Sequence, residues 1–208
     1  MQLTAIVWLI LCLIWGSTWM VIKVGLGDLP PIGFAGIRFI LATVILFAVL
    51  RARKLSLPSS AKEWRLIALT GILQFSFNYS LVFWSEQYIS SGLAALLQTT
   101  ISLFGLLLAW IFLPSERITK KKVVAVCLGV AGVAAIFSEQ LKAQGTMAFA
   151  GSVGIVVSAY TASQAAILVK AQGGGFHPAT LLFGQMICGL PPIIAYSLIV
   201  EGSPLNYH

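Results

Sequence analysis

Residues 3–22 read LTAIVWLILCLIWGSTWMVI, a stretch without a charged side chain. About 20 mostly apolar residues in a helix suffice to cross the hydrocarbon core of a bilayer. Six stretches of similar character follow, so the sequence predicts seven membrane-spanning helices, although the fifth is short. They are Leu3–Ile22, Gly33–Leu50, Leu66–Trp84, Gly92–Leu113, Val123–Ser138, Ala148–Val169 and Pro178–Val200. Helices satisfy their own backbone hydrogen bonds in lipid, and the sequence lacks the short alternating segments of a membrane β-barrel.

The composition also indicates an all-α, polytopic transmembrane helical bundle, because 59% of the residues are hydrophobic and 9% are charged. A soluble fold of this composition would have too few polar side chains for its surface. The net charge of +7 arises from basic loops, and we expect no binding of nucleic acid. Ten of the thirteen basic residues are predicted on one side of the membrane: Arg51, Arg53, Lys54, Lys62, Arg65, Arg117, Lys120, Lys121, Lys122 and Lys170. The positive-inside rule makes this side cytoplasmic, together with the amino terminus.

A weak internal repeat appears when the sequence is shifted by 147 residues, which places Lys23 on Lys170 and Pro31 on Pro178. In both copies a helix ends at the lysine, a glycine-containing linker follows, and the proline opens the next helix. Five spans separate the copies, so the second copy enters the membrane from the opposite side, as in the inverted repeats of transporters. We therefore expect a first repeat of five helices over residues 1–138, an extracytoplasmic linker over 139–147 and the first two helices of a second repeat over 148–208. We also expect that the sequence is truncated at its carboxyl end and that the 208-residue form is inactive.

The first predicted helix carries candidate solute contacts. Trp15 and Trp19 lie one turn apart on one helical face, and Ser17 lies between them in the sequence. This face either packs against another helix, with Gly16 permitting close approach, or forms the aromatic wall of a cavity. Both interpretations remain open.

Arg38 is the one basic residue well inside a predicted span. A guanidinium in a membrane is costly and usually faces protein or water. We first interpret it as a structural residue that snorkels outward or pins a carbonyl, and the alternative is that it attracts an anionic group of a substrate.

Neutral polar side chains occur at middle depth in several other helices. Gln74 and Asn78 are four residues apart in the third, Gln98 lies in the fourth, and Tyr160 and Gln164 share a face of the sixth. Each could simply form a hydrogen bond between helices, but their convergence predicts a site for an organic solute. The candidate substrate-binding residues are Trp15, Ser17, Trp19, Arg38, Gln74, Asn78, Gln98, Tyr160 and Gln164.

Catalytic and metal chemistry have little support in the sequence. No Asp or Glu lies inside a predicted span and both histidines lie outside, so we expect no proton relay, catalytic residue, metal site or cofactor. Cys12, Cys127 and Cys188 are scattered through apolar spans, as is typical of packing residues rather than of disulfides or metal ligands. We therefore do not expect an enzyme. The alternatives are a membrane-embedded enzyme, which would need clustered histidines and carboxylates, and a seven-helix receptor. A retinal protein would need a lysine in the seventh span, which has none.

Several short motifs resemble the EamA-type transporters of the drug/metabolite transporter superfamily. They are Trp15-Gly16 followed by Lys23, Pro31 followed by Arg38, the run SGLAALLQ at residues 91–98, ERIT at 116–119 and LGVAGV at 128–133. The resemblance implies ten helices in two inverted five-helix repeats. It also implies a permease that moves small metabolites or drugs across the bacterial inner membrane, by alternating access and in the direction of export. It does not indicate an oligomeric state.

Two departures from this family pattern are visible. Pro114-Ser115-Glu116 replaces the usual Leu-Gly-Glu, and the proline expected near Ser102 is missing. Because proline is the commonest cause of a helix kink, the sequence gives no signal for a kink in the fourth helix.

Overall fold

The computed structural model describes residues 2–113, 119–143, 145–172 and 175–202, which fold into helices and short connections without a strand among them. The prediction of an all-α bundle is thus confirmed. The departure at Pro114–Glu116 lies outside the described residues. The elements are α1 (Gln2–Gly25), α2 (Pro31–Ala52), α3 (Ala61–Gly71), η1 (Ile72–Asn78), α4 (Tyr79–Glu86), α5 (Ser91–Gln98), α6 (Thr100–Phe112), α7 (Lys120–Ala143), α8 (Gly145–Gln172), α9 (Pro178–Tyr196) and η2 (Ser197–Glu201).

Seven helical segments correspond to the seven predicted spans, because α3, η1 and α4 are continuous, as are α9 and η2, and α5 joins α6. Six of the segments are long and apolar enough to cross a membrane, and α7, which starts with three lysines, is not among these six. Several helix boundaries differ from the prediction, and two of them lie at the expected linker. α7 runs on to Ala143 and α8 begins at Gly145, so most of the residues expected in the 139–147 linker are helical.

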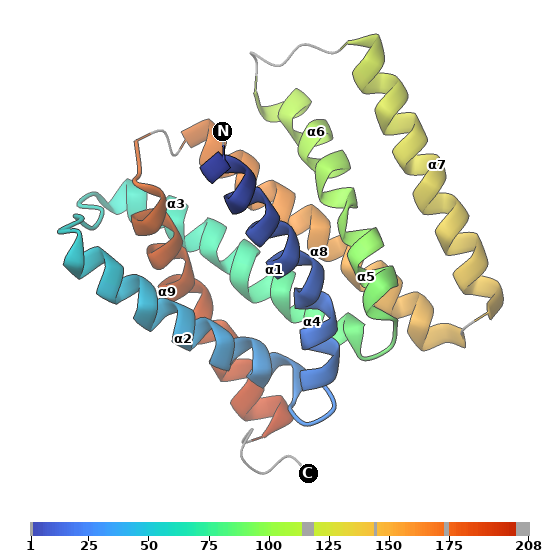
Figure 1. Cartoon of the computed structure of the whole chain (residues 1–208), viewed down its shortest axis with the longest axis horizontal. Helices are drawn as coiled ribbons and strands as arrows, with labels where there is room; N and C mark the ends of the chain where they lie inside the picture. Colours follow the sequence, from blue (N-terminus) through green and yellow to red (C-terminus); the bar gives the residue numbers. More distant parts are fainter. Residues whose placement is uncertain (1, 114–118, 144, 173–174, 203–208) are drawn as a thin grey trace.

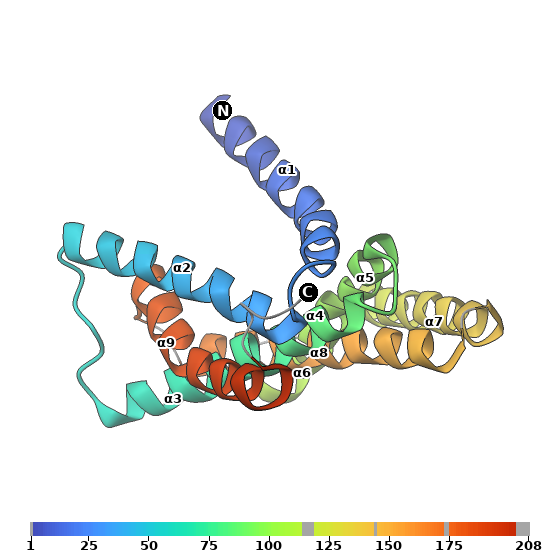
Figure 2. The same ribbon diagram turned by 90° about the horizontal axis from the view of Figure 1, so that it is seen from below.

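The helices form a broad slab from which α1 projects (Figures 1 and 2). α8 runs through the slab and packs against α3, η1, α4, α5, α6 and α7, while α9 packs against α2, α3 and η1. The shared core contains Phe39, Phe75, Phe83, Leu97, Ile155 and Ile193. Only 6% of the most apolar part of α1 is buried against other helices. Figure 2 shows the amino-terminal half of α1 leaning away from the other helices. Most of α1, including much of the face that points toward the slab, is therefore not packed against other helices.

The helix starts follow local sequence signals. Pro31 and Pro178 each occupy the first turn of a helix, where the missing N–H costs nothing. Ser60 and Glu63 form a reciprocal capping box at the start of α3. At α2, the carboxylate of Glu201 accepts hydrogen bonds from the N–H groups of Ile32 and Gly33, at 2.9 and 2.8 Å. An anion at a helix amino terminus interacts favourably with the helix dipole, so this contact ties η2 to α2.

The third span contains a π-helical segment, η1, where it crosses α9. Gly71 and Gly189 permit the close approach: a Cβ on Gly71 would lie 2.4 Å from the carbonyl oxygen of Gln185, and one on Gly189 would lie 2.7 Å from that of Gly71. Buried hydrogen bonds join the two helices, from Ser76 Oγ to the Gly189 carbonyl (2.7 Å) and from Gln185 Nε2 to Thr70 Oγ1 (2.9 Å). Small residues and interhelical hydrogen bonds are the usual means of helix association in membranes.

The fourth span is interrupted at Thr99, although it has no proline there. The hydroxyls of Thr99 and Thr100 each donate to a carbonyl three residues back, at 2.7 Å. From α8, Ser163 donates to the Ile101 carbonyl at 2.8 Å. Side-chain hydroxyls that bond to helix carbonyls often bend helices. These bonds account for the interruption at Thr99 in a span that has no proline there.

Candidate functional site

A cavity of about 450 Å³ lies between the open face of α1 and the slab. Residues of α1, α2, η1, α4, α5, α6 and α8 line this cavity. The lining residues are Ile14, Trp15, Thr18, Trp19, Ile22, Arg38, Gln74, Asn78, Tyr79, Val82, Gln98, Ile101 and Ala162. A volume of this size suits a small organic molecule.

The face of α1 supplies the aromatic side of the cavity. Trp15 and Trp19 both line it. Trp15 is 60% exposed, while Trp19 also packs against the core. No atom outside the helix lies within 4 Å of a Cβ built on Gly16, so the helix packing expected at that glycine is absent here.

Arg38 reaches the cavity from α2. Its guanidinium lies over the rings of Phe34 and Phe83, at 5.9 and 5.4 Å from their centroids, which is cation–π geometry. Its Nη1 is buried without a hydrogen-bond partner, so the guanidinium does not pin a carbonyl through this atom. A buried donor without a partner is unfavourable, because its desolvation is not compensated by a hydrogen bond.

The amide side chains extend the polar part of the lining. Gln74 and Asn78 project from η1, and the Oδ1 atom of Asn78 is buried without a hydrogen-bond partner. Gln98 accepts a hydrogen bond from Ser158 Oγ at 3.0 Å, which fixes its carbonyl end against α8. Arg38 and Asn78, which both line the cavity, thus each carry one buried polar atom without a hydrogen-bond partner.

Three of the nine candidate residues are not among those that line this cavity. Ser17 donates back to the carbonyls of Leu13 and Ile14, at 2.8 and 3.2 Å, the local bond that its position allows. Tyr160 packs edge-on against Phe104 of α6, and Gln164 is half-buried elsewhere on α8. Ala162 is the α8 residue that lines the cavity, and positions two residues away point about 200° around the helix. The other six candidates, Trp15, Trp19, Arg38, Gln74, Asn78 and Gln98, lie together.

One buried carboxylate, Glu86, lies just beyond the predicted third span. Glu86 was placed outside the third span because the apolar run stops at Trp84, but α4 continues to Glu86 and its side chain is fully buried. The expectation that every predicted helix lacks a carboxylate is therefore wrong for the helix as it forms. A second carboxylate, Glu201, also closes a helix, η2. Tyr79, which lines the cavity, was missed as well.

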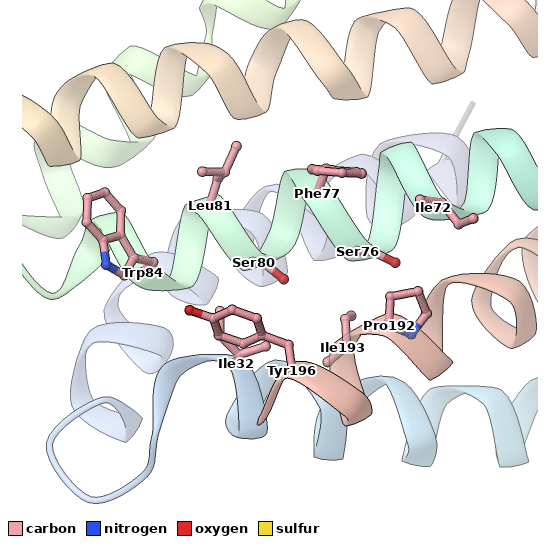
Figure 3. A pocket seen from close by; sticks show the side chains of 10 residues that line it. All are labelled: Ile32, Ile72, Ser76, Phe77, Ser80, Leu81, Trp84, Pro192, Ile193 and Tyr196. Carbon is pink, nitrogen blue, oxygen red and sulfur yellow. The ribbon is translucent and has the colours of Figure 1, made fainter. Parts of the chain in front are cut away.

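A second cavity of about 460 Å³ lies on another face of the third span, between η1, α4 and α9. Figure 3 shows Ser76 and Ser80 pointing from the third span toward α9, with Trp84 and Tyr196 at one end. The hydroxyl of Ser76 is already bonded to α9, and most of the other side chains here are apolar. This second cavity offers a solute little polar recognition, so we take the α1-lined cavity as the candidate site.

The described residues contain neither a cluster of possible metal ligands nor a disulfide. Among them no group of three or more His, Cys, Asp and Glu side chains lies close enough to hold a metal ion. All three cysteines are free, and the exposure of Cys12 and Cys127 contradicts their interpretation as packing residues. The chemistry available in the cavity is recognition by aromatic rings, amides and one guanidinium.

Comparison with known proteins gives one family and several relatives. The model of the EamA-like transporter family matches residues 2–138. The chain is similar to the "Uncharacterized transporter YoaV" of Bacillus subtilis (24% identity; 92% of this chain and 65% of the relative). It is also similar to the "Uncharacterized inner membrane transporter YedA" of Escherichia coli K12 (36%; 59% of this chain and 40% of the relative). A third relative is the "Probable amino-acid metabolite efflux pump" of Escherichia coli K12 (26%; 96% and 65%). The chain thus spans less than two thirds of the length of these relatives. No solved structure matches it.

Proposed function

Because the chain belongs to the EamA-like transporter family, we propose that it is the solute-binding part of a permease that exports a small organic molecule across the bacterial inner membrane. The observation that carries this proposal is the α1-lined cavity, in which six candidate residues from four helical segments of the first repeat surround one volume. The family match and the six long apolar helices support a multi-pass membrane transporter. The route through this cavity, the direction and the substrate belong to the proposal.

The lining suggests the chemistry of the solute. Arg38 brings a guanidinium to the cavity lining, which suits an anionic group, and Asn78 brings an amide, which suits an N–H or O–H group. Trp15, Trp19 and Tyr79 provide rings for an apolar or aromatic body. A zwitterion with an apolar side chain, such as an amino acid, matches all three features. The name of one relative, a probable amino-acid metabolite efflux pump, supports both this class and the outward direction.

Alternating access is supported by the irregular helices around the cavity. η1 is π-helical, the fourth span is interrupted at Thr99, and α1 has few contacts with the slab. Such irregular segments often lie at functional sites and provide places where a helix changes direction. The proposal keeps two inverted repeats, divided after residue 138, as the bodies that move against each other. We also place the basic 51–65 connection in the cytoplasm. Strong reaction of a Ser59→Cys variant with a membrane-impermeant reagent in intact cells would contradict this placement.

The direct test is counterflow in liposomes that contain the protein expressed from its full gene. The panel comprises aromatic and aliphatic amino acids, nucleosides and amphipathic drugs. We expect saturable exchange for at least one amino acid, competed by its unlabelled form, because each protein offers a limited number of binding sites. Protein-free liposomes are the control. Exchange that stays at the level of protein-free liposomes for every compound would contradict the proposed function.

A further inference from the structure

A third cavity, of about 530 Å³, adjoins the α1-lined cavity and lies between α2, η1, α8 and α9. We call it the α8–α9 cavity, after the two helices that supply most of its lining, which includes Phe39, Gln74, Phe75, Tyr79, Ala166 and Gln185. Two of these residues, Gln74 and Tyr79, also line the α1-lined cavity. The two volumes therefore share a wall.

The two cavities follow each other along the helices. On α8, Ala162 lines the α1-lined cavity, whereas Ala166, one turn nearer the carboxyl end, lines the α8–α9 cavity. The third span runs antiparallel to α8, and on it the α1-lined cavity extends to Val82 while the lining of the α8–α9 cavity stops at Tyr79. Both spans thus put the α8–α9 cavity nearer the basic 51–65 connection, which we place in the cytoplasm.

The ring of Tyr79 lies in the shared wall and is held by two phenylalanines. Its centroid lies 4.7 Å from that of Phe39 and 5.9 Å from that of Phe75, and the two phenylalanine rings are 5.1 Å apart. Phe39 and Phe75 are buried in the core, while Tyr79 is half-buried. Aromatic pairs of this kind stabilise a preferred ring orientation, so Tyr79 is positioned between the two cavities.

The lining of the α8–α9 cavity suits a solute without net charge. Among the described residues that line it none is charged, and the polar groups are the amides of Gln74 and Gln185 and the hydroxyl of Tyr79. Gln185 already donates from Nε2 to Thr70 Oγ1, at 2.9 Å. A net charge in such surroundings is unfavourable, whereas a zwitterion with an apolar side chain brings no net charge and buries its apolar part.

We propose that the α8–α9 cavity is a second site for the transported solute, which occupies it on the way to the α1-lined cavity, and that the ring of Tyr79 separates the two sites. The inference rests on the proposed function, because it extends the export route through both cavities. Gln74 and Phe75 belong to η1, and Tyr79 follows it directly. π-helical segments such as η1 frequently occur at functional sites.

A cysteine in the α8–α9 cavity tests the second site. Ala166 lines this cavity and is exposed, so Ala166→Cys in the full-length protein without the three native cysteines should react with a membrane-impermeant maleimide. We expect complete modification to abolish counterflow of the solute, because the attached group fills the route. Ala171→Cys is the matched control, since Ala171 is an exposed alanine of α8 that lines neither cavity. It should react and keep its counterflow.

This experiment separates the inference from the proposed function. Counterflow by the unmodified Ala166→Cys protein tests the proposed function, and its loss on modification tests the second site. Full counterflow after complete modification, measured by mass spectrometry of the intact protein, overturns the inference, as do equal losses in Ala166→Cys and Ala171→Cys. A thiol that does not react also overturns it, since a cavity that carries a polar solute must admit a polar reagent. If Ala166→Cys is inactive before modification, Val169→Cys in the same cavity takes its place.

Tyr79→Ala tests the separation of the two sites without a transport assay. Thr18 lines the α1-lined cavity, and the maleimide, applied from the side of the membrane that labels Ala166→Cys, should label Thr18→Cys slowly while the ring is present. We expect Tyr79→Ala to raise this rate by about tenfold or more, and Tyr79→Phe to leave it unchanged because it keeps the ring. An unchanged rate in a monodisperse Tyr79→Ala protein overturns the inference. If Tyr79→Ala does not fold, the Ala166→Cys result decides alone.

Discussion

Replacing Trp15 by alanine should lower the apparent affinity for the transported solute by about 30-fold, which corresponds to the roughly 2 kcal/mol typical of a truncated aromatic anchor. Trp15 lines the α1 side of the cavity and is 60% exposed, so its ring contributes little to the core. The amount of protein in the membrane should therefore stay near that of the wild type. Transport kinetics together with quantitative blotting of the membrane fraction measure both effects.

Trp8→Ala is the matched control for this variant. Trp8 lies on the same helix, is 65% exposed and is not among the residues that line the cavity, so transport should change little. A loss of abundance that parallels the loss of transport in Trp15→Ala would show that Trp15 is a packing residue. Equal losses of transport in the two variants would contradict a specific role for the cavity wall.

Replacing Gly71 by valine should remove most of the folded protein. A Cβ at this position would lie 2.4 Å from the carbonyl oxygen of Gln185, which is backbone and cannot rotate away. Overpacking of this kind costs about 1–3 kcal/mol or more and here would separate the third span from α9. The same contact places η1, so the loss would include the Gln74 and Asn78 side of the cavity. Thermal stability and monodispersity in detergent measure the effect.

Gly105→Val serves as the control for the glycine substitution. Gly105 is also helical, and nothing lies within 4 Å of a Cβ built there. We expect it to retain near wild-type stability, since valine is no worse than glycine inside a helix. Similar stability of the two variants would contradict the close approach of α9 to the third span at Gly71.

Composition predicts the spans well because the bilayer imposes a simple requirement on length and polarity. It does not predict how regular each helix is. The π-helical turn of η1 depends on Gly71 meeting α9 and on Ser76 bonding to Gly189, and these contacts join residues more than a hundred positions apart. The interruption at Thr99 similarly depends on Ser163 of α8. Neither arises from local propensity.

The candidate site could be predicted in part, for reasons that differ by residue. The spacing of Trp15 and Trp19 fixes a shared face whatever that face meets. The shared face of Tyr160 and Gln164 gave no information about its neighbour, and α8 turns Ala162 toward the cavity instead. Glu86 has a signal in the sequence, because it is an acidic residue two positions after an apolar run. In the structure its backbone carbonyl accepts a hydrogen bond from Lys23. A predicted span that ends at its last apolar residue, Trp84, leaves Glu86 outside the helix.

Two adjacent residues of α1 allow a direct measurement of whether the solute passes through the α1-lined cavity. Thr18 lines the cavity and Ser17 does not, while the hydroxyls of both donate to carbonyls of their own helix. Each would be changed to cysteine in a background that lacks the three native cysteines, and the rate of maleimide labelling would be measured with and without the solute identified by counterflow. We predict that the solute slows labelling of Thr18→Cys and leaves Ser17→Cys unchanged. Equal labelling of Thr18→Cys with and without saturating solute would contradict passage of the solute through this cavity.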